Sequence, residues 1–488
     1  MPNGSGGWLV VQLRKAYEEE AKKGHESEEQ EGEEQEGREQ VIREQVSRGQ
    51  EGREEQESKE QEGREQVSGE HVSVEHESKE QEGREQVSRE QVSGELKSVE
   101  QESRGQEGRE EQESKEQEGR EQVSGEHMSN EQANKELQEP EHGDKVAKDP
   151  KFQVEPLLVH PDASPETRGL MRYLCSIYGR SMLTGQQIGV LSTPELDLIH
   201  EVTGRYPAVA GFDFMNYSPS RVERGATCRD TDLAIDWWKN RGGIVTFCWH
   251  WNAPKDLIDL PPDRTWGSGF YTKATTFDVK KAMANTGSEE YRLILRDIDA
   301  IAVELKRLAD ARVPVLWRPL HEASGGWFWW GAKGPEPCIA LWKLMYHRLT
   351  YEHGLNHLIW VWNGQHADWY PGDEFVDIIG EDIYAPVRDY SSQQERFRTA
   401  ESYTQTPKII AMSENGVVPD PDRVAEDGTP WAWNCTWYGT FVYREEDGRL
   451  AYSEEYTELE QLRKTYRHPR TITLEELPDW EEWMKEKG

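Results

Sequence analysis

Two stretches of the chain, Trp317-Arg318-Pro319-Leu320-His321-Glu322 and Ile410-Ala411-Met412-Ser413-Glu414-Asn415-Gly416, carry the most information about its fold. Each begins as an apolar run, reaches a glutamate and then enters a loop that contains glycine. Runs of this kind predict strands buried on both faces, as in a parallel sheet covered by helices. The carboxyl ends of such strands are where ligands bind. Glu322 and Glu414 are therefore candidates for one shared site.

After residue 165 the chain alternates short β-branched or aromatic runs with segments of helical pattern. The runs predict eight strands, over residues 181–188, 208–215, 244–251, 313–320, 357–362, 376–384, 408–413 and 431–437. Helices are expected over residues 194–203, 230–241, 289–311, 337–353, 393–405 and 454–466, with short or irregular connections over 365–374 and 419–428. Eight such units predict an α/β protein with a (β/α)₈ TIM barrel. A doubly wound open sheet is the competing fold, but no glycine-rich dinucleotide turn follows the first expected strand.

The order of the strands brings the two glutamates together. Glu322 falls just past the fourth expected strand and Glu414 just past the seventh. In a barrel both then face the C-terminal opening, where active sites form. His250, Tyr384 and Trp437 end the third, sixth and eighth expected strands, so they converge on the same opening.

The first 150 residues differ in composition from the rest. They hold 43 Asp and Glu against 21 Lys and Arg, and only two aromatic residues, Trp8 and Tyr17. Residues 47–71 recur identically as 103–127, and the sparse valines are often five apart, which gives no coiled-coil seam. So little apolar surface cannot offset chain entropy. We expect residues 1–150 to be disordered Glu/Gln-rich repeats and linker, and residues 151–488 to form the barrel domain.

Composition also limits the partners and the location. The formal net charge is −36 at pH 7, which argues against a nucleic-acid partner because phosphate binding needs clustered Lys and Arg. No apolar run approaches the roughly 20 residues of a transmembrane helix, so we expect no membrane partner. Trp8-Leu9-Val10-Val11 is too short for the apolar core of a signal peptide. All five cysteines follow residue 150 without metal or redox spacing, and are expected to be buried free thiols.

Paired carboxylates among aromatic rings fit the cleavage of a glycosidic bond. That reaction needs one carboxylic acid to protonate the leaving oxygen and one carboxylate that faces the anomeric carbon. The aromatic run after Glu322 suits an acid of raised pKa. Glu414 can be reached by Tyr384 and Arg318, donors that would keep a carboxylate charged and oriented.

Neighbouring residues add a sugar platform but no metal site. Trp327 and Trp437 offer flat apolar faces to a sugar ring. The His321-Glu322-Ala323 run lacks the second histidine that a zinc-peptidase motif requires. Asp230 and Asp232 begin an expected helix, where acidic side chains suit the helix dipole. We therefore expect no metal and no cofactor.

Several ordered motifs resemble those of family 26 glycoside hydrolases, most of which are endo-β-1,4-mannanases. They are the run from Gly243 to Asn252, the Arg318-to-Glu322 run with Gly-Gly-Trp after it, and Tyr370-Pro371-Gly372-Asp373 leading to Gly380-Glu381-Asp382-Ile383-Tyr384. The resemblance covers about residues 165–450. It implies a (β/α)₈ barrel with catalytic glutamates on strands four and seven, and a retaining mechanism.

Carried over by motif, the resemblance assigns Glu322 as the acid/base and Glu414 as the nucleophile. It implies that His321 supports this pair and that Tyr384 hydrogen-bonds the nucleophile. The residues implied to line the sugar site are His250, Trp327, Asp382 and Trp437, with Trp433 as the alternative to Trp437. The implied partner is a β-mannan polysaccharide or oligosaccharide (mannan, glucomannan or galactomannan). Such a substrate leads us to expect an extracellular enzyme, although no signal peptide is visible.

Three other functions remain open at this point. The same machinery could act on mixed-linkage β-glucan or on β-1,3-xylan, because a few loop residues decide which hydroxyl group is recognised. The domain could bind carbohydrate without cleaving it. The acidic N-terminal region could carry the function, with the barrel as a passenger.

Overall fold

The expected barrel is present in the computed structural model, which describes residues 152–189, 193–446 and 449–485. Parallel strands in chain order close into one barrel, and its last strand pairs with its first. The barrel strands are β2 (Gly185–Gln187), β3 (Val209–Asp213), β4 (Ile244–Cys248), β5 (Val315–Arg318), β6 (Leu358–Trp362), β7 (Ile378–Ile383), β8 (Ile409–Asn415) and β9 (Asn434–Thr436). The (β/α)₈ fold is thus confirmed and the open sheet is excluded. The expected disorder of residues 1–150 lies outside the described residues.

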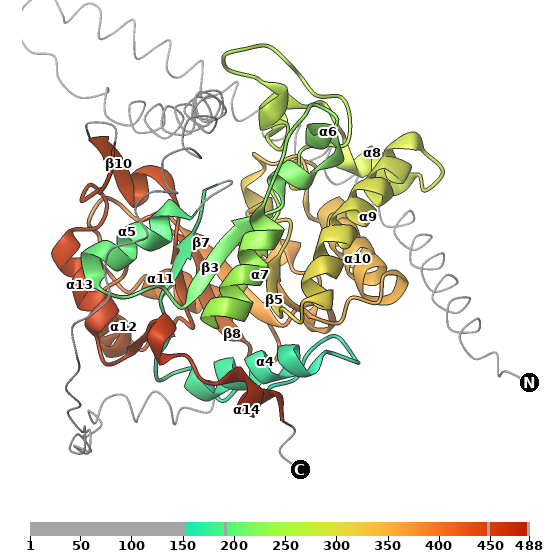
Figure 1. The fold of residues 1–488 in the computed structure, drawn as a ribbon. Helices are drawn as coiled ribbons and strands as arrows, with labels where there is room; N and C mark the ends of the chain where they lie inside the picture. The colour runs from blue at the N-terminus through green and yellow to red at the C-terminus, as the bar shows by residue number, and fades with distance from the viewer. Residues whose placement is uncertain (1–151, 190–192, 447–448, 486–488) are drawn as a thin grey trace, which may run out of the picture. The chain divides into compact units, whose positions relative to one another are not determined.

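Helices surround the strands (Figure 1). They are α4 (Pro165–Ile177), α5 (Pro194–Thr203), α6 (Pro219–Val222), α7 (Asp230–Arg241), α8 (Val279–Ala284), α9 (Glu289–Asp310), α10 (Pro335–His347), α11 (Gln394–Glu401), α12 (Pro421–Glu426), α13 (Leu459–Arg467) and α14 (Trp480–Met484).

The long helix α9 shows how the sequence specifies these outer elements. Ser288 caps its start by accepting a hydrogen bond from the Tyr291 N–H. Ile294, Ile298 and Ile301 recur at helical spacing and are buried, so one face of α9 packs toward the barrel. At the end of α7, Gly242 adopts a φ of +74°, the left-handed conformation that ends a helix and that glycine reaches without strain.

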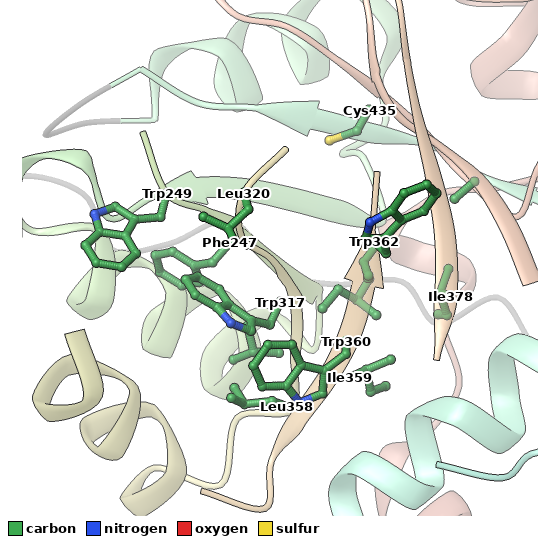
Figure 2. Close-up of a cluster of buried hydrophobic side chains, with 14 of the residues drawn as sticks. Phe247, Trp249, Trp317, Leu320, Leu358, Ile359, Trp360, Trp362, Ile378 and Cys435 are labelled. Carbon is green, nitrogen blue, oxygen red and sulfur yellow. The ribbon is translucent and has the colours of Figure 1, made fainter. Parts of the chain in front are cut away.

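Aromatic residues fill the layer between strands and helices. Phe247, Trp317 and Trp360 sit side by side in register on β4, β5 and β6 and project into one cluster (Figure 2). Trp360 packs against Trp342 of α10, with ring centroids 5.6 Å apart, so this face of the strands is the outer one. Because side chains alternate along a strand, the next residue, Arg318, must point into the barrel.

Segments near both ends of the described chain close the barrel at its N-terminal side. The expected strand 181–188 is divided into β1 (Met182–Leu183) and β2, and β1 pairs with β12 (Thr471–Ile472) instead of joining the barrel. Helix α14 lies beside α4 (Figure 1), where the Trp480 ring meets Tyr173 edge-on at 5.3 Å. These late segments therefore pack against the elements that begin the barrel.

Several expected boundaries were wrong. The expected helix 454–466 begins only at Leu459, because a hairpin of β10 (Tyr443–Glu446) and β11 (Arg449–Tyr452), which was not expected, precedes it. The expected helix 337–353 is α10 followed by a π-helical segment, Arg348–Glu352. The irregular connection 365–374 contains short 3₁₀ turns, and 419–428 contains α12. Short helices such as α6 and α8 were not expected, since their few residues show no clear periodicity.

The cysteines were expected to be buried free thiols, and this is wrong for two of them. All five cysteines are free; Cys248, Cys338 and Cys435 are buried, whereas Cys175 and Cys228 are partly exposed. Among the described helices, none combines the length and the apolar character needed to cross a bilayer.

Candidate active site

Glu322 and Glu414 lie at the C-terminal end of the barrel, on its fourth and seventh strands. Glu322 follows β5, as expected. Glu414 lies inside β8 and not past it, because the strand runs two residues further than the sequence suggested. One carboxylate oxygen from each, together with one from Asp382, lies within 4.8 Å of the others. The structure thus brings the two predicted glutamates into one site.

A bulge in β8 turns Glu414 toward this site. In the ladder with β7, Glu381 faces Met412 and Asp382 faces Glu414, so Ser413 is the extra residue. A bulge changes the direction in which the following side chain points. The Ser413 hydroxyl donates to Asp382 at 2.8 Å, and the next residue, Glu414, bonds inside the barrel as well. Two consecutive side chains therefore point inward, which a regular strand does not allow.

Glu322 sits in a turn that departs from ordinary backbone geometry. Leu320 and Glu322 both have a φ of +52°, a conformation that costs non-glycine residues energy. The Glu322 N–H donates to the Asn363 carbonyl at 3.0 Å, which ties the turn to the end of β6. Such strain persists where the surrounding structure imposes it, and it concentrates at functional sites.

Glu414 is surrounded by hydrogen-bond donors. The Tyr384 hydroxyl donates to its Oε2 at 2.7 Å, and the Arg318 guanidinium donates to its Oε1. Arg318 is 1 % exposed and also donates to Asp382 at 3.0 Å. Burial opposes the charge of Arg318, but the two carboxylates outweigh it and hold its pKa well above the ordinary value. A permanent positive charge therefore faces Glu414 inside the barrel.

Glu322 has the opposite surroundings. Burial, and after it the negative charge of Glu414, raises the pKa of Glu322 to about 7. Trp327 donates from its indole nitrogen to Glu322 Oε2 at 2.9 Å and works against this rise. A carboxyl group of raised pKa beside a second carboxyl group is suited to act as a general acid.

Two histidines meet beside the glutamates. The Nε2 atoms of His250 and His321 are 3.2 Å apart, and His250 Nδ1 is 2.6 Å from Asp213 Oδ2. Burial, then the positive charges on His250 and Arg318, holds the pKa of His321 well below its ordinary value. His321 is therefore a neutral imidazole at physiological pH.

The aromatic residues differ in how far a sugar could reach them. Trp327 is 46 % exposed and Tyr384 38 % exposed, and Trp437 is partly exposed beside His250, with ring centroids 5.7 Å apart. Trp433 is 1 % exposed within the core, so Trp437 and not Trp433 is placed to stack on a ligand.

Sequence reasoning missed three polar residues of this site. Asp213 ends β3, Asn363 follows β6 and donates to Asp382 at 2.5 Å, and Ser413 forms the bulge. A polar residue at the end of an expected strand was the available signal for Asp213 and Asn363. Nothing in the sequence marks Ser413, because a bulge depends on the register of the neighbouring strand.

The cluster of Glu322, Asp382 and Glu414 supplies oxygen atoms that could approach a cation. Arg318 already donates to two of the three carboxylates, so the positive charge that a metal ion would provide is supplied by the protein itself. The donor set does not call for a metal.

Replacing Arg318 with methionine should lower the free energy of unfolding by about 3–5 kcal/mol at pH 7, because two buried carboxylates lose their counter-charge. The loss should shrink at pH 5, because burial raises the pKa of Asp382 and its carboxyl group can then take up a proton. Urea unfolding followed by tryptophan fluorescence measures both values. Arg307 is a matched control, since it also bonds two acids, Glu304 and Asp232, but is 42 % exposed. Equal losses in the two variants would contradict this account of Arg318.

A closed (β/α)₈ barrel with two neighbouring glutamates at the ends of its fourth and seventh strands defines the class of barrel glycoside hydrolases. The chain belongs to glycosyl hydrolase family 26, whose family model matches residues 159–476.

The relatives of this chain carry consistent names. It is 45% identical over 333 residues to a mannan endo-1,4-beta-mannosidase of Thermothelomyces thermophilus, which is 68% of this chain and 66% of that relative's length. The solved structure of a GH26-CBM35 beta-(1,4)-mannanase of Podospora anserina matches with a TM-score of 0.63 at 43% identity, covering 67% of this chain and 70% of that one. A beta-mannanase from a symbiotic protist of the termite Reticulitermes speratus, solved with a gluco-manno-oligosaccharide, matches with a TM-score of 0.59 at 35% identity over 67% and 98% of the two chains.

Proposed function

We propose that this protein is a retaining endo-β-1,4-mannanase that hydrolyses mannan, glucomannan or galactomannan. The observation that carries the reaction type is the pair of Glu322 and Glu414, whose nearest carboxylate oxygens lie within 4.8 Å. Retaining glycosidases hold their two carboxyl groups about 5–5.5 Å apart, whereas inverting ones leave about 6.5–9.5 Å for a water molecule. The names of the relatives support the choice of β-mannan as substrate.

In the proposed reaction Glu414 attacks the anomeric carbon while the bond from that carbon to the leaving oxygen breaks. Glu322 gives its proton to this oxygen, and the leaving sugar departs as an alcohol. Glu322, now a carboxylate, then takes a proton from water as the water oxygen attacks the anomeric carbon and releases Glu414. Two inversions leave the β configuration of the product unchanged.

The surrounding residues fit supporting roles. Tyr384 and Arg318 hold the Glu414 carboxylate in place by hydrogen bonds. Asp382 and His321 fix the polar wall beside the reacting carbon, and Trp437 and His250 border the space in which the sugar ring would lie. Trp327 bonds the proton donor and offers its exposed face to the leaving-group sugar.

Release of reducing sugar tests the function directly. The full chain is incubated with glucomannan, galactomannan, mixed-linkage β-glucan and β-1,3-xylan, and viscosity is recorded in parallel. Release from both mannans, with viscosity falling long before most bonds are cut, is the expected result. Activity on glucan or xylan alone would keep the mechanism and remove the mannanase assignment. Folded protein that binds mannan in calorimetry but releases nothing would make it a carbohydrate-binding protein.

The raised pKa of Glu322, about 7, predicts a pH dependence. The neutral carboxyl group of Glu322 is the active form, so the pH profile of kcat/KM should have a basic limb, a fall as pH rises through about 7. Replacing Trp327 with phenylalanine removes a donor that stabilises the ionised form, and should therefore move this basic limb up by roughly half a pH unit. Trp483→Phe on α14 is the control and should leave the limb in place. A downward shift in Trp327→Phe would contradict the proposed role.

Residues 151–488 are proposed as the complete catalytic unit. Phe152 packs on Tyr178, with ring centroids 5.9 Å apart, so the hydrophobic core already includes residue 152. Deleting residues 1–150 should leave kcat and KM on soluble glucomannan unchanged. A large loss of turnover in folded, truncated protein would instead assign the function to the acidic region.

A further inference from the structure

Asp213 lies at the C-terminal end of β3, and the reaction proposed above gives it no role. Both of its carboxylate oxygens are nevertheless engaged. Oδ1 accepts from the backbone N–H groups of Met215 at 2.8 Å and of His250 at 3.0 Å, and Oδ2 lies 2.6 Å from His250 Nδ1. The Asp213 N–H in turn donates to Asp230 at the start of α7 at 3.2 Å. Backbone N–H groups therefore hold the Asp213 carboxylate in the position from which it contacts His250 Nδ1.

These bonds determine which nitrogen of His250 carries a proton. An ionised carboxylate only accepts hydrogen bonds, so Nδ1 of His250 must be protonated. The other nitrogen, Nε2, faces His321 Nε2 at 3.2 Å, where one ring must donate to the other. His321 is 1 % exposed and directly precedes Glu322 in the strained turn. A continuous chain of bonds therefore leads from β3 to the residue beside the proposed proton donor.

We propose that Asp213 is a positioning residue of this site: it holds His250 as the ring that donates to His321, and through these two rings sets the orientation and the charge next to Glu322. The expected shift of the pH profile rests on the proposed function, whereas the hydrogen bonding of the two histidines does not.

The charges around His250 favour the same arrangement. Burial works against a charged imidazole, but Asp213 outweighs it and the pKa of His250 is raised. Glu414 on β8 adds to this rise and Arg318 on β5 opposes it. Cys248 on β4, a thiol whose pKa burial raises, and His321, whose pKa is held low, also lie beside the ring and add no charge near neutral pH. Glu322, in the turn after β5, is a further acid that interacts with the charge of His250.

These charges predict in which direction the pH profile of kcat/KM moves when Asp213 is replaced. A protonated His250 is a positive charge that lowers the pKa of Glu322. When Asp213 becomes asparagine, the amide keeps the shape but not the charge, and His250 loses its proton at a lower pH. Glu322 then loses a cationic neighbour and its pKa rises. The basic limb of kcat/KM should move upward.

The experiment compares Asp213→Asn with wild type and with Asp377→Asn in the full chain, using glucomannan across pH 4.5–9. Asp377 is a matched control, because its buried carboxylate also accepts two backbone N–H groups, from Val159 and Trp360, but lies before β7 at the opposite end of the barrel. Asp213→Asn should shift the basic limb up by roughly 0.5–1 pH unit, and Asp377→Asn should not shift it. An unmoved limb in folded Asp213→Asn would overturn the proposal.

A second measurement needs no catalytic activity. ¹⁵N-histidine labelling of the wild-type chain, with the His250 signals assigned through His250→Gln, reports which ring nitrogen is protonated as pH is varied. His250 protonated on Nδ1 throughout, and charged to a higher pH than an ordinary histidine, is expected. An unprotonated Nδ1 at pH 7 would overturn the proposal. A wild-type chain that cleaves no mannan but shows this titration would refute the proposed function alone.

Discussion

Replacing Glu414 with alanine should lower kcat on β-mannan by at least about 10⁴-fold. This loss corresponds to an increase of roughly 5.5 kcal/mol in the activation free energy. The covalent intermediate cannot form without this carboxylate, because the other nearby acid, Asp382, is held by Arg318, Asn363 and Ser413. The fold should survive, since Arg318 keeps Asp382 as its counter-charge. Reducing-sugar release measures the loss.

The mechanism also predicts how the lost activity returns. Alanine leaves a space beside the anomeric carbon, and a small anion such as azide can enter it and attack in place of Glu414. The product on an activated aryl β-mannoside should be the α-mannosyl azide, with inverted configuration, because only one displacement then occurs. Glu381→Gln is the control, because Glu381 directly precedes Asp382 on β7 but bonds Arg396 on α11, outside the barrel. A β-mannosyl azide from Glu414→Ala would refute the assignment of the nucleophile.

The fold was predictable from the sequence because its signals are local. The runs that became β4, β5 and β6 are mostly β-branched or aromatic, and those that became β7 and β8 each begin with two isoleucines, so each carries its own strand signal. The strand–helix order then fixes which strand ends meet, so Glu322 and Glu414 could be placed together without knowing a single distance. The hairpin of β10 and β11 had such a signal too, Asp447-Gly448 between two short runs, although its strands are too polar to resemble those of the barrel.

The parts that could not be predicted depend on pairing between distant residues. The sequence indicated that Arg318 could reach Glu414, but not that the same guanidinium also bonds Asp382 inside the barrel. The turn of Glu414 into the site depends on a register shift against β7. Asp213 acquires its partner, His250, 37 residues away and just after the next strand. None of these relations leaves a periodic pattern in the chain.

Replacing Glu322 with alanine should produce a different defect from that of Glu414→Ala, and this difference tests the division of roles. On mannan, kcat should fall by about 10²–10⁴-fold, the usual contribution of a general acid. On a dinitrophenyl β-mannobioside, whose leaving group needs no proton, the first step should remain fast and the glycosyl-enzyme should accumulate, visible as a burst and a lowered KM.

Two further readouts separate Glu322 from a residue of merely structural importance. Azide should now attack the accumulated intermediate from the side of Glu322 and give the β-mannosyl azide, opposite in configuration to the product of Glu414→Ala. The basic limb near pH 7 should vanish from the pH profile on the activated substrate, because the group whose pKa is raised to about 7 has been removed. Trp327→Phe keeps that carboxyl group and should keep the limb. A limb that persists in Glu322→Ala would mean that another group is the proton donor. Desolvation of its hydroxyl and the surrounding carboxylates hold the pKa of Tyr384 well above its ordinary value, so Tyr384 does not titrate near pH 7. His250 would then be the next residue to test.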